Sequence, residues 1–159
     1  MMPNSRPILL VEDDCVDMMA AQRALKDLQV QNPLAYVGNG EEALAYLRGP
    51  GHETPCVILL DLNMPKLNGI EFLRIIKADE TLKAIPVVVV TTSVEKQDVA
   101  ETFRLGTAAY IVKCFDYGEF REGMRAIEPY LTGARPAERP EPALLGTGEP
   151  FPDRHGGYL

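Results

Sequence analysis

The sequence predicts an α/β fold built on a doubly wound parallel sheet of five strands. Over the first 131 of 159 residues, short runs rich in Val, Ile and Leu alternate with longer amphipathic segments. Strict alternation of strand and helix requires right-handed crossovers, and these place helices on both faces of a parallel sheet. The runs 57–60 and 87–90 contain only apolar residues, which is typical of central strands buried on both faces.

Five strands and five helices are expected in order along the chain. The strands are expected over 7–12, 33–37, 56–61, 86–91 and 108–112. Four helices are expected over 15–28, 41–47, 69–77 and 95–105, with Gly106 ending the fourth. A fifth helix carries a core-facing stripe of Phe120, Met124, Ile127 and Leu131. These elements predict the flavodoxin-like strand order 2-1-3-4-5.

The composition changes after Leu131, so we expect one domain over 1–131 and a tail over 132–159. The tail has five prolines and five glycines and no helical or strand periodicity. It is expected to be flexible, with contacts to another subunit as the alternative. It is too short for an output domain.

Composition narrows the function classes. The net charge of −7 disfavours binding to nucleic acid or anionic lipid. The chain contains no apolar run of the ~20 residues that a membrane span needs, and its N-terminus lacks a signal-peptide hydrophobic region. The three cysteines lie far apart and the two histidines are too few for a multi-histidine metal site. We therefore expect a cytoplasmic protein without a disulfide framework.

Polar side chains stand at the carboxyl ends of the predicted strands, where open α/β sheets bind ligands. Glu12 and Asp13 follow the first strand, Asp61 follows the third, Thr91 ends the fourth and Lys113 follows the fifth. Three carboxylates, a hydroxyl and an ammonium are therefore expected at one edge. The neighbouring Asp14 is expected to cap the first helix instead.

Carboxylates that pack closely repel each other, and this raises the pKa of each. Either protonation or a bound divalent cation relieves the repulsion. A site of oxygen ligands suits Mg²⁺, and the backbone carbonyl of Asn63 is the expected additional ligand. Such a site can receive a phosphoryl group, which Asp61 attacks to form an acyl phosphate. Lys113 and Thr91 are then expected to stabilise the phosphoryl oxygens, although a merely solvated Lys113 is the alternative. Asn63 and Ser93 are candidates to orient or obstruct a hydrolytic water.

Four motifs in this order resemble the receiver domain of two-component response regulators. The resemblance covers about residues 6–131 and rests on Ile8-Leu-Leu-Val-Glu-Asp-Asp14, Asp61-Leu-Asn-Met-Pro65 with Asn68-Gly69, Pro86-Val-Val-Val-Val-Thr-Thr92 and Tyr110-Ile-Val-Lys113. It implies that Asp61 is the phosphoacceptor, and that Thr91 and Lys113 bind the phosphoryl group. It also implies that Glu12, Asp13, Asp61 and the Asn63 carbonyl hold Mg²⁺, and that Tyr110 is an aromatic switch.

The resemblance implies a single-domain regulator that a sensor histidine kinase phosphorylates. It is expected to be no turnover enzyme, although slow self-dephosphorylation is allowed. Phosphorylation would draw Thr91 inward with Tyr110 following, and this would change the face formed by helix 4, strand 5 and helix 5. That face is expected to bind a partner or a second copy, with apolar contacts from Val94, Phe103, Tyr110 and Tyr117.

The run Thr91-Thr92-Ser93 and the connection 79–85 are similar to the small regulators that partner phytochrome-type kinases. The chain departs from the family at Cys114, where the family has a proline that commonly follows a cis peptide bond. A cis bond before a residue other than proline costs about 2.5–4 kcal/mol, so we expect a trans bond with a shifted loop, or strain held by packing.

Two other functions fit the same architecture. A phosphatase or phosphotransferase working through an aspartyl phosphate often has a second acid two residues beyond the nucleophile, but Asn63 stands there. A flavin-binding module needs hydroxyls and glycine after the first strand, whereas Glu12, Asp13 and Asp14 would repel a phosphate.

Overall fold

The computed structural model describes residues 6–64, 66–114 and 116–131, and the backbone of 143–145. The strands are β1 Ile8–Val11, β2 Leu34–Val37, β3 Val57–Leu60, β4 Val87–Thr91, β5 Ala109–Val112 and β6 Ala143–Leu145. The α-helices are α1 Cys15–Asp27, α2 Gly40–Arg48, α3 Gly69–Ala78, α4 Lys96–Arg104 and α5 Tyr117–Met124, and a 3₁₀ helix, η1, spans Arg125–Tyr130.

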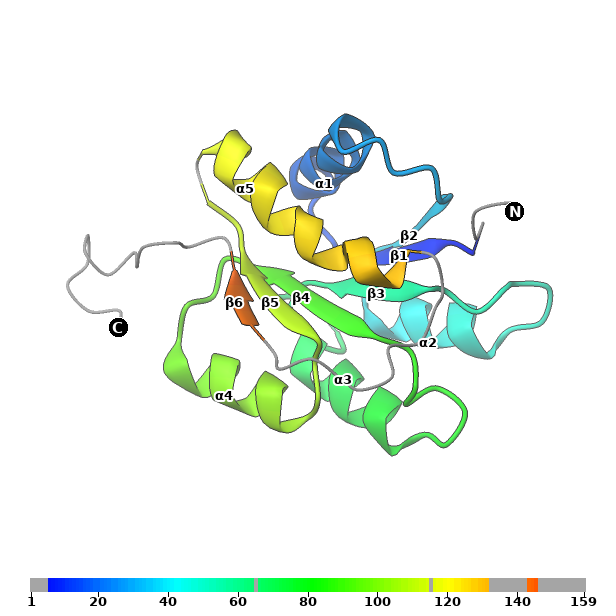
Figure 1. Ribbon diagram of the computed structural model, residues 1–159. Helices are drawn as coiled ribbons and strands as arrows, with labels where there is room; N and C mark the ends of the chain where they lie inside the picture. The colour runs from blue at the N-terminus through cyan, green and yellow to red at the C-terminus, as the bar shows by residue number, and fades with distance from the viewer. Residues whose placement is uncertain (1–5, 65, 115, 132–142, 146–159) are drawn as a thin grey trace.

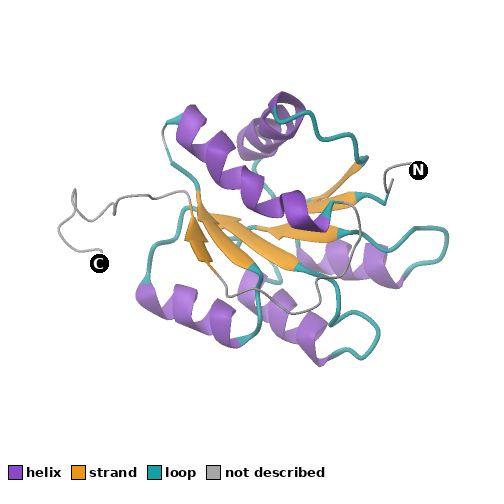
Figure 2. Cartoon of the chain, viewed as in Figure 1, coloured by secondary structure: helices purple, strands orange, loops and turns teal. Residues whose placement is uncertain are grey.

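The strands form one parallel sheet in the order β2-β1-β3-β4-β5-β6. The predicted order of the first five strands is therefore confirmed. Helices α1 and α5 cover one face, and α2, α3 and α4 cover the other, as the three layers in Figures 1 and 2 show. In this order β1 lies between β2 and β3, so the chain reverses its direction of winding at β1.

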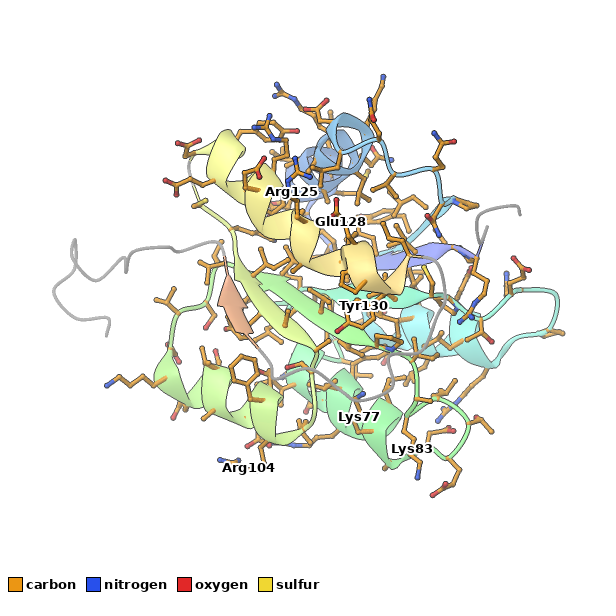
Figure 3. The ribbon with its side chains drawn as sticks, viewed as in Figure 1. Lys77, Lys83, Arg104, Arg125, Glu128 and Tyr130 are labelled. Atoms are coloured by element: carbon orange, nitrogen blue, oxygen red, sulfur yellow. The ribbon has the colours of Figure 1, made fainter. Side chains whose placement is uncertain are left out.

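Two apolar layers fix the helices to the sheet because successive strand residues point to opposite faces. In β1, Ile8 and Leu10 pack into the layer under α1 and α5, while Leu9 and Val11 pack into the layer above α2 and α3. Charged side chains lie on the outside, as Arg104 of α4 and Arg125 and Glu128 of η1 show (Figure 3). Among the described helices, none combines the length and the apolar character that crossing a bilayer requires.

The predicted helix ends are well supported by local hydrogen bonds. Asp14 caps α1 as expected, because its side chain accepts from the backbone N–H groups of Val16 and Asp17. Gly106 follows α4 with φ of 94°, a left-handed conformation that glycine adopts without a steric penalty.

The fifth helix differs from the single helix that was expected through Leu131. The α-helix ends at Met124, and the chain continues as the tighter η1, which contains Pro129. Proline has no N–H to donate and its ring collides with the carbonyl four residues earlier, so a regular α-helix cannot continue through it. The predicted stripe survives this change in part, since Phe120, Met124 and Ile127 are buried and Leu131 packs partly buried against the same layer.

The expectation that no strand forms within 132–159 is wrong at 143–145. Ala143, Leu144 and Leu145 pair in parallel with Ala109, Tyr110 and Ile111 of β5. A strand at the end of a sheet has unpaired N–H and C=O groups along its outer edge, and β6 satisfies those of β5. The rest of the predicted tail lies outside the described residues.

Gly69 allows α3 to begin directly against the chain that carries Asp61. A Cβ at this position would lie 2.5 Å from the Asp61 carbonyl oxygen and 2.6 Å from the Leu62 Cα. Both contacts are to backbone atoms, so the start of α3 or the end of β3 would have to move. We expect Gly69→Ala to lower the free energy of unfolding by about 3 kcal/mol in urea denaturation.

The matched control is Gly38→Ala, whose Cβ would meet only the Glu42 carboxylate at 3.5 Å, an ordinary contact. This variant should unfold within about 0.5 kcal/mol of the unmodified protein. Equal stability of the two variants would contradict the close approach at Gly69.

Candidate functional site

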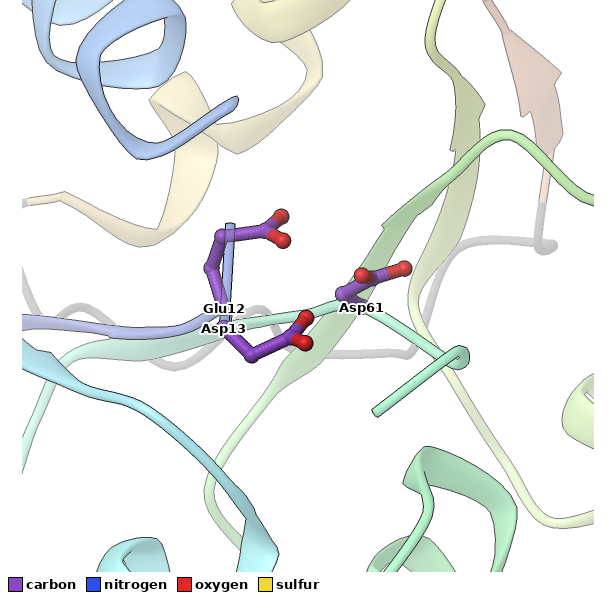
Figure 4. Close-up of side chains that lie close together, drawn as sticks. All are labelled: Glu12, Asp13 and Asp61. Atoms are coloured by element: carbon purple, nitrogen blue, oxygen red, sulfur yellow. The ribbon is translucent and has the colours of Figure 1, made fainter. Parts of the chain in front are cut away.

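Three carboxylates meet at the carboxyl ends of β1 and β3. The two strands are neighbours with Val11 opposite Leu60, so the residues that follow them, Glu12, Asp13 and Asp61, emerge at the same edge. Their carboxylate oxygens lie within 4.8 Å of one another. Figure 4 shows that the three side chains lie close together. Glu12 and Asp61 are buried and Asp13 is exposed, which gives the predicted cluster a closed and an open side.

The electrostatic cost of this cluster appears at Glu12. Burial, and the negative charge of Asp61, raise the pKa of Glu12 to about 7, while hydrogen bonding to Lys113 acts in the opposite direction. The side chain is only 3% exposed, so water cannot screen its charge. A site with this preference for a proton equally favours a cation.

Lys113 supplies the positive charge that the structure itself provides. Its Nζ donates to Glu12 Oε1 at 2.7 Å and to Asp17 Oδ2 at 2.8 Å, and lies 3.7 Å from Asp61 Oδ2. Burial acts to lower the pKa of Lys113, but hydrogen bonding to Asp17 and Glu12 prevails and raises it. The alternative of a solvated lysine is wrong, because the side chain is 13% exposed.

Asp17 is the site residue that the sequence analysis missed. It lies in the first turn of α1, the helix that begins directly after Glu12 and Asp13. An acid in the first turn of a helix that starts at the site was the one signal that could have found it, although the helix dipole explains such an acid equally well.

Thr91 and Asn63 close another side of the site. The Thr91 side chain is fully buried at the end of β4, and its Oγ1 accepts from the Ser93 N–H at 3.4 Å and from Asn63 Nδ2 at 3.5 Å. The Asn63 N–H donates to Asp61 Oδ1 at 3.3 Å. Asn63 therefore contacts Asp61 directly, and Thr91 is linked to Asp61 through Asn63.

Tyr110 is fully buried, so it cannot supply the exposed apolar contact that was expected of it. Its hydroxyl donates to the Ser93 carbonyl oxygen at 2.9 Å, and its ring packs edge-on to Phe103. Burial raises the pKa of Tyr110 to about 12. Ser93 also donates to Asp98 of α4 through Oγ, at 2.6 Å, and thereby joins Thr91, Tyr110 and α4 in one network.

The peptide bond between Lys113 and Cys114 is trans, because the structure has no cis peptide bond among the described residues. A trans bond was one of the two alternatives expected.

A groove of about 620 Å³ lies beside the carboxylates, over the start of α3. It is lined by Asp13, Asn63, Met64, Arg74 and Asp98, among others.

The donor set fits a hard divalent cation. All of the converging ligand atoms are carboxylate oxygens, and no sulfur or imidazole belongs to the cluster. Asp13 on the open side leaves room for water ligands, which small divalent cations usually retain.

The raised pKa of Glu12 predicts a specific pH dependence of stability. The folded state holds this proton up to about pH 7, whereas an unfolded glutamate loses it near its ordinary pKa of 4.5. Stability should therefore fall as pH rises between these values. In the presence of a chelator, the Glu12→Gln variant should not show this fall. Its free energy of unfolding should therefore rise by about 2–3 kcal/mol relative to that of the unmodified protein as the pH is raised from 4.5 to 8.

Urea denaturation at several pH values measures this gain. Glu80→Gln, at a side chain that is 84% exposed, is the control and should leave the pH profile unchanged. An unchanged profile in Glu12→Gln would show that burial does not perturb this carboxyl.

Comparison with known proteins gives a consistent result. A family model described as "Response regulator receiver domain" matches residues 8–125. Response regulator Rcp1 of Synechocystis is 37% identical over 127 residues, which are 77% of this chain and 86% of Rcp1. The crystal structure of Mn²⁺-bound Rcp1 superposes with a TM-score of 0.73 and 35% identity, covering 82% of this chain and 97% of that one.

A second solved structure is that of the phosphorylated cyanobacterial phytochrome response regulator RcpA. It has a TM-score of 0.72 and 37% identity, and the match covers 84% of this chain and 99% of RcpA. These proteins span almost the same length as the described fold.

Proposed function

The chain belongs to the response regulator receiver domain family and is a two-component response regulator, and we propose that Asp61 is its phosphoacceptor. The observation that carries this proposal is the convergence of Glu12, Asp13 and Asp61 within 4.8 Å beside the Lys113 ammonium. A carboxylate so placed is a nucleophile surrounded by groups that compensate the charge of an arriving phosphoryl group.

In the proposed transfer, an Asp61 carboxylate oxygen attacks the phosphorus of a phosphohistidine. The new O–P bond forms as the P–N bond breaks, and the imidazole nitrogen leaves with the electron pair. Lys113 and the Thr91 hydroxyl are positioned to donate to phosphoryl oxygens, because each lies against Asp61 or its neighbour Asn63. Asn63 and Ser93 remain the candidates to orient or obstruct the water that later hydrolyses the acyl phosphate.

We assign the physiological cation as Mg²⁺, held by Glu12, Asp13, Asp61 and the backbone carbonyl of Asn63. The carboxylates fit it by their oxygen donors and their closeness, and the similar Rcp1 binds Mn²⁺. When bound, a divalent cation neutralises charge on the phosphoryl group.

The phosphodonor is proposed to be a sensor histidine kinase of phytochrome type, because the similar RcpA is a phytochrome response regulator. The proposal includes a cytoplasmic location, a receiver domain over 1–131, and a segment rich in proline and glycine over 132–159. A homodimer or partner complex was expected on the surface of α4, β5 and α5; because β6 covers the edge of β5, we propose that it forms on α4 and α5 beside β6, where Val94 and Phe103 are only partly buried.

The network through Ser93 supports a switch on that surface. Phosphorylation would redirect the Thr91 hydroxyl, and the Ser93 N–H that now donates to it would transmit the change to the Tyr110 hydroxyl and α4. Because Tyr110 is already buried before phosphorylation, the change expected is a shift in the population of two existing states.

Phosphorylation by a small phosphodonor tests the proposal. With Mg²⁺, a donor such as acetyl phosphate should give a phosphoryl adduct that is stable in acid and labile in base, as an acyl phosphate is. Chelation of the cation should reduce labelling by at least about tenfold. Labelling that is independent of a divalent cation would contradict the assignment, and a transfer profile that ranks phytochrome kinases last would contradict the partner.

A further inference from the structure

We propose that Asp17 is a positioning residue of this site, which holds Lys113 away from Asp61 and thereby weakens capture of the phosphoryl group. The inference rests on the proposed function, since it concerns the same phosphoacceptor. It follows from how the three donors of a single ammonium are distributed among the carboxylates around it.

The Lys113 ammonium donates its hydrogen bonds to Glu12 and Asp17 and not to the proposed phosphoacceptor. Two of its three N–H donors are used by Glu12 at 2.7 Å and Asp17 at 2.8 Å. Asp61 lies at 3.7 Å, which is beyond hydrogen-bonding distance. Asp17 therefore has a stronger contact with Lys113 than the proposed phosphoacceptor has.

The position of the Asp17 carboxylate is set by α1. The residue lies in the first helical turn, and its own N–H donates to the Asp14 cap at 3.1 Å. The helix in turn packs on α5 and on the apolar layer between these two helices and the sheet. The helix thus fixes the backbone from which the Asp17 carboxylate extends, and Lys113 is the partner that must turn toward an arriving phosphoryl group.

Phosphorylation of Asp61 would create competition for this ammonium. The phosphoryl group brings negatively charged oxygens next to Asp61, and Lys113 must turn toward them from Asp17. The Asp17 side chain is 37% exposed, so water screens part of its charge and the competition is moderate. Removing this carboxylate should strengthen binding of a phosphoryl mimic by about fivefold to tenfold.

Affinity for beryllium fluoride, a mimic of the phosphoryl group, tests the inference. At saturating Mg²⁺, calorimetric titration should show that Asp17→Asn binds about fivefold to tenfold more tightly than the unmodified protein. Asp17→Glu keeps the charge and should restore the original affinity to within about twofold. Asp27→Asn is the matched control, because it makes the same charge change on the same helix, at a carboxylate paired with Tyr117 and Arg23.

The effect must act through Lys113. In a Lys113→Met background, Asp17→Asn should change the affinity by less than about twofold, because no ammonium remains to be released. A gain of equal size in that background would overturn the inference in favour of direct charge repulsion. No gain, or a loss, in Asp17→Asn alone would overturn it as well.

A structure of the Asp17→Asn protein provides a second measurement that does not depend on the stability of the Lys113 variant. The distance from Lys113 Nζ to Asp61 Oδ2 should shorten to about 3 Å. An unchanged distance would overturn the inference. Failure of the unmodified protein to bind beryllium fluoride would instead overturn the proposed function itself.

Discussion

Replacing Asp61 with asparagine should abolish phosphorylation of the chain. The amide oxygen is a much weaker nucleophile than a carboxylate oxygen, so an acyl phosphate cannot form on it. With acetyl phosphate and Mg²⁺, incorporation of phosphoryl groups should fall by at least about a hundredfold. Because Asn has almost the same shape as Asp, the fold around the buried side chain should persist.

Two controls make the loss specific. Asp27→Asn changes the charge of α1 far from the site and should be labelled normally. Asp13→Asn leaves the nucleophile in place but removes a proposed cation ligand, so its labelling should fall and should recover in part at higher Mg²⁺. Undiminished labelling of Asp61→Asn would move the phosphoacceptor to another residue.

Replacing Lys113 with methionine should destabilise the metal-free protein strongly at pH 8. The variant leaves Glu12, which is 3% exposed, and Asp61 without the ammonium that lies beside both. Breaking a buried ion pair on one side commonly costs 3–5 kcal/mol, and the open side of this site reduces the expected loss to about 2–4 kcal/mol. At pH 5.5 the loss should shrink to about 1 kcal/mol, because Glu12, with its pKa raised to about 7, is then protonated.

Urea denaturation at the two pH values, in a chelator, measures the effect. Lys83→Met is the matched control, because Lys83 forms a comparable ion pair with Glu80 at 2.9 Å between side chains that are 50% and 84% exposed. Its cost should be below about 1 kcal/mol at both pH values. A loss in Lys113→Met that is equally small would show that this ammonium does not compensate the cluster.

Much of the site follows from topology alone. A parallel sheet of order 2-1-3-4-5 brings the ends of β1 and β3 together. The polar residues that follow these two apolar runs were therefore expected to lie close together. The acid after the buried run 57–60 was informative because a carboxylate gains nothing from such a position without a partner. Lys113 follows β5, which β4 separates from β3, so its contact with the acids also depends on the reach of its long side chain.

Other features depend on side-chain geometry that the pattern does not specify. Asp17 belongs to a helix, where an acid in the first turn is usually explained by the helix dipole. The inward rotamer of Tyr110 depends on the Ser93 carbonyl, which lies on a different loop. Strand β6 was missed because three residues among prolines and glycines have no periodicity, and their pairing depends on β5.

The pairing of β6 with β5 also determines how this protein can associate. With Ala143–Leu145 in place, both sides of β5 are occupied, and no foreign strand can extend the sheet there without first displacing the chain's own segment. A strand added on this side would instead have to pair with the outer edge of β6, which is only three residues long. A fragment that stopped at Leu131 would leave the edge of β5 unpaired. This edge would then tend to pair with extended peptides, including segments of a second copy of the fragment.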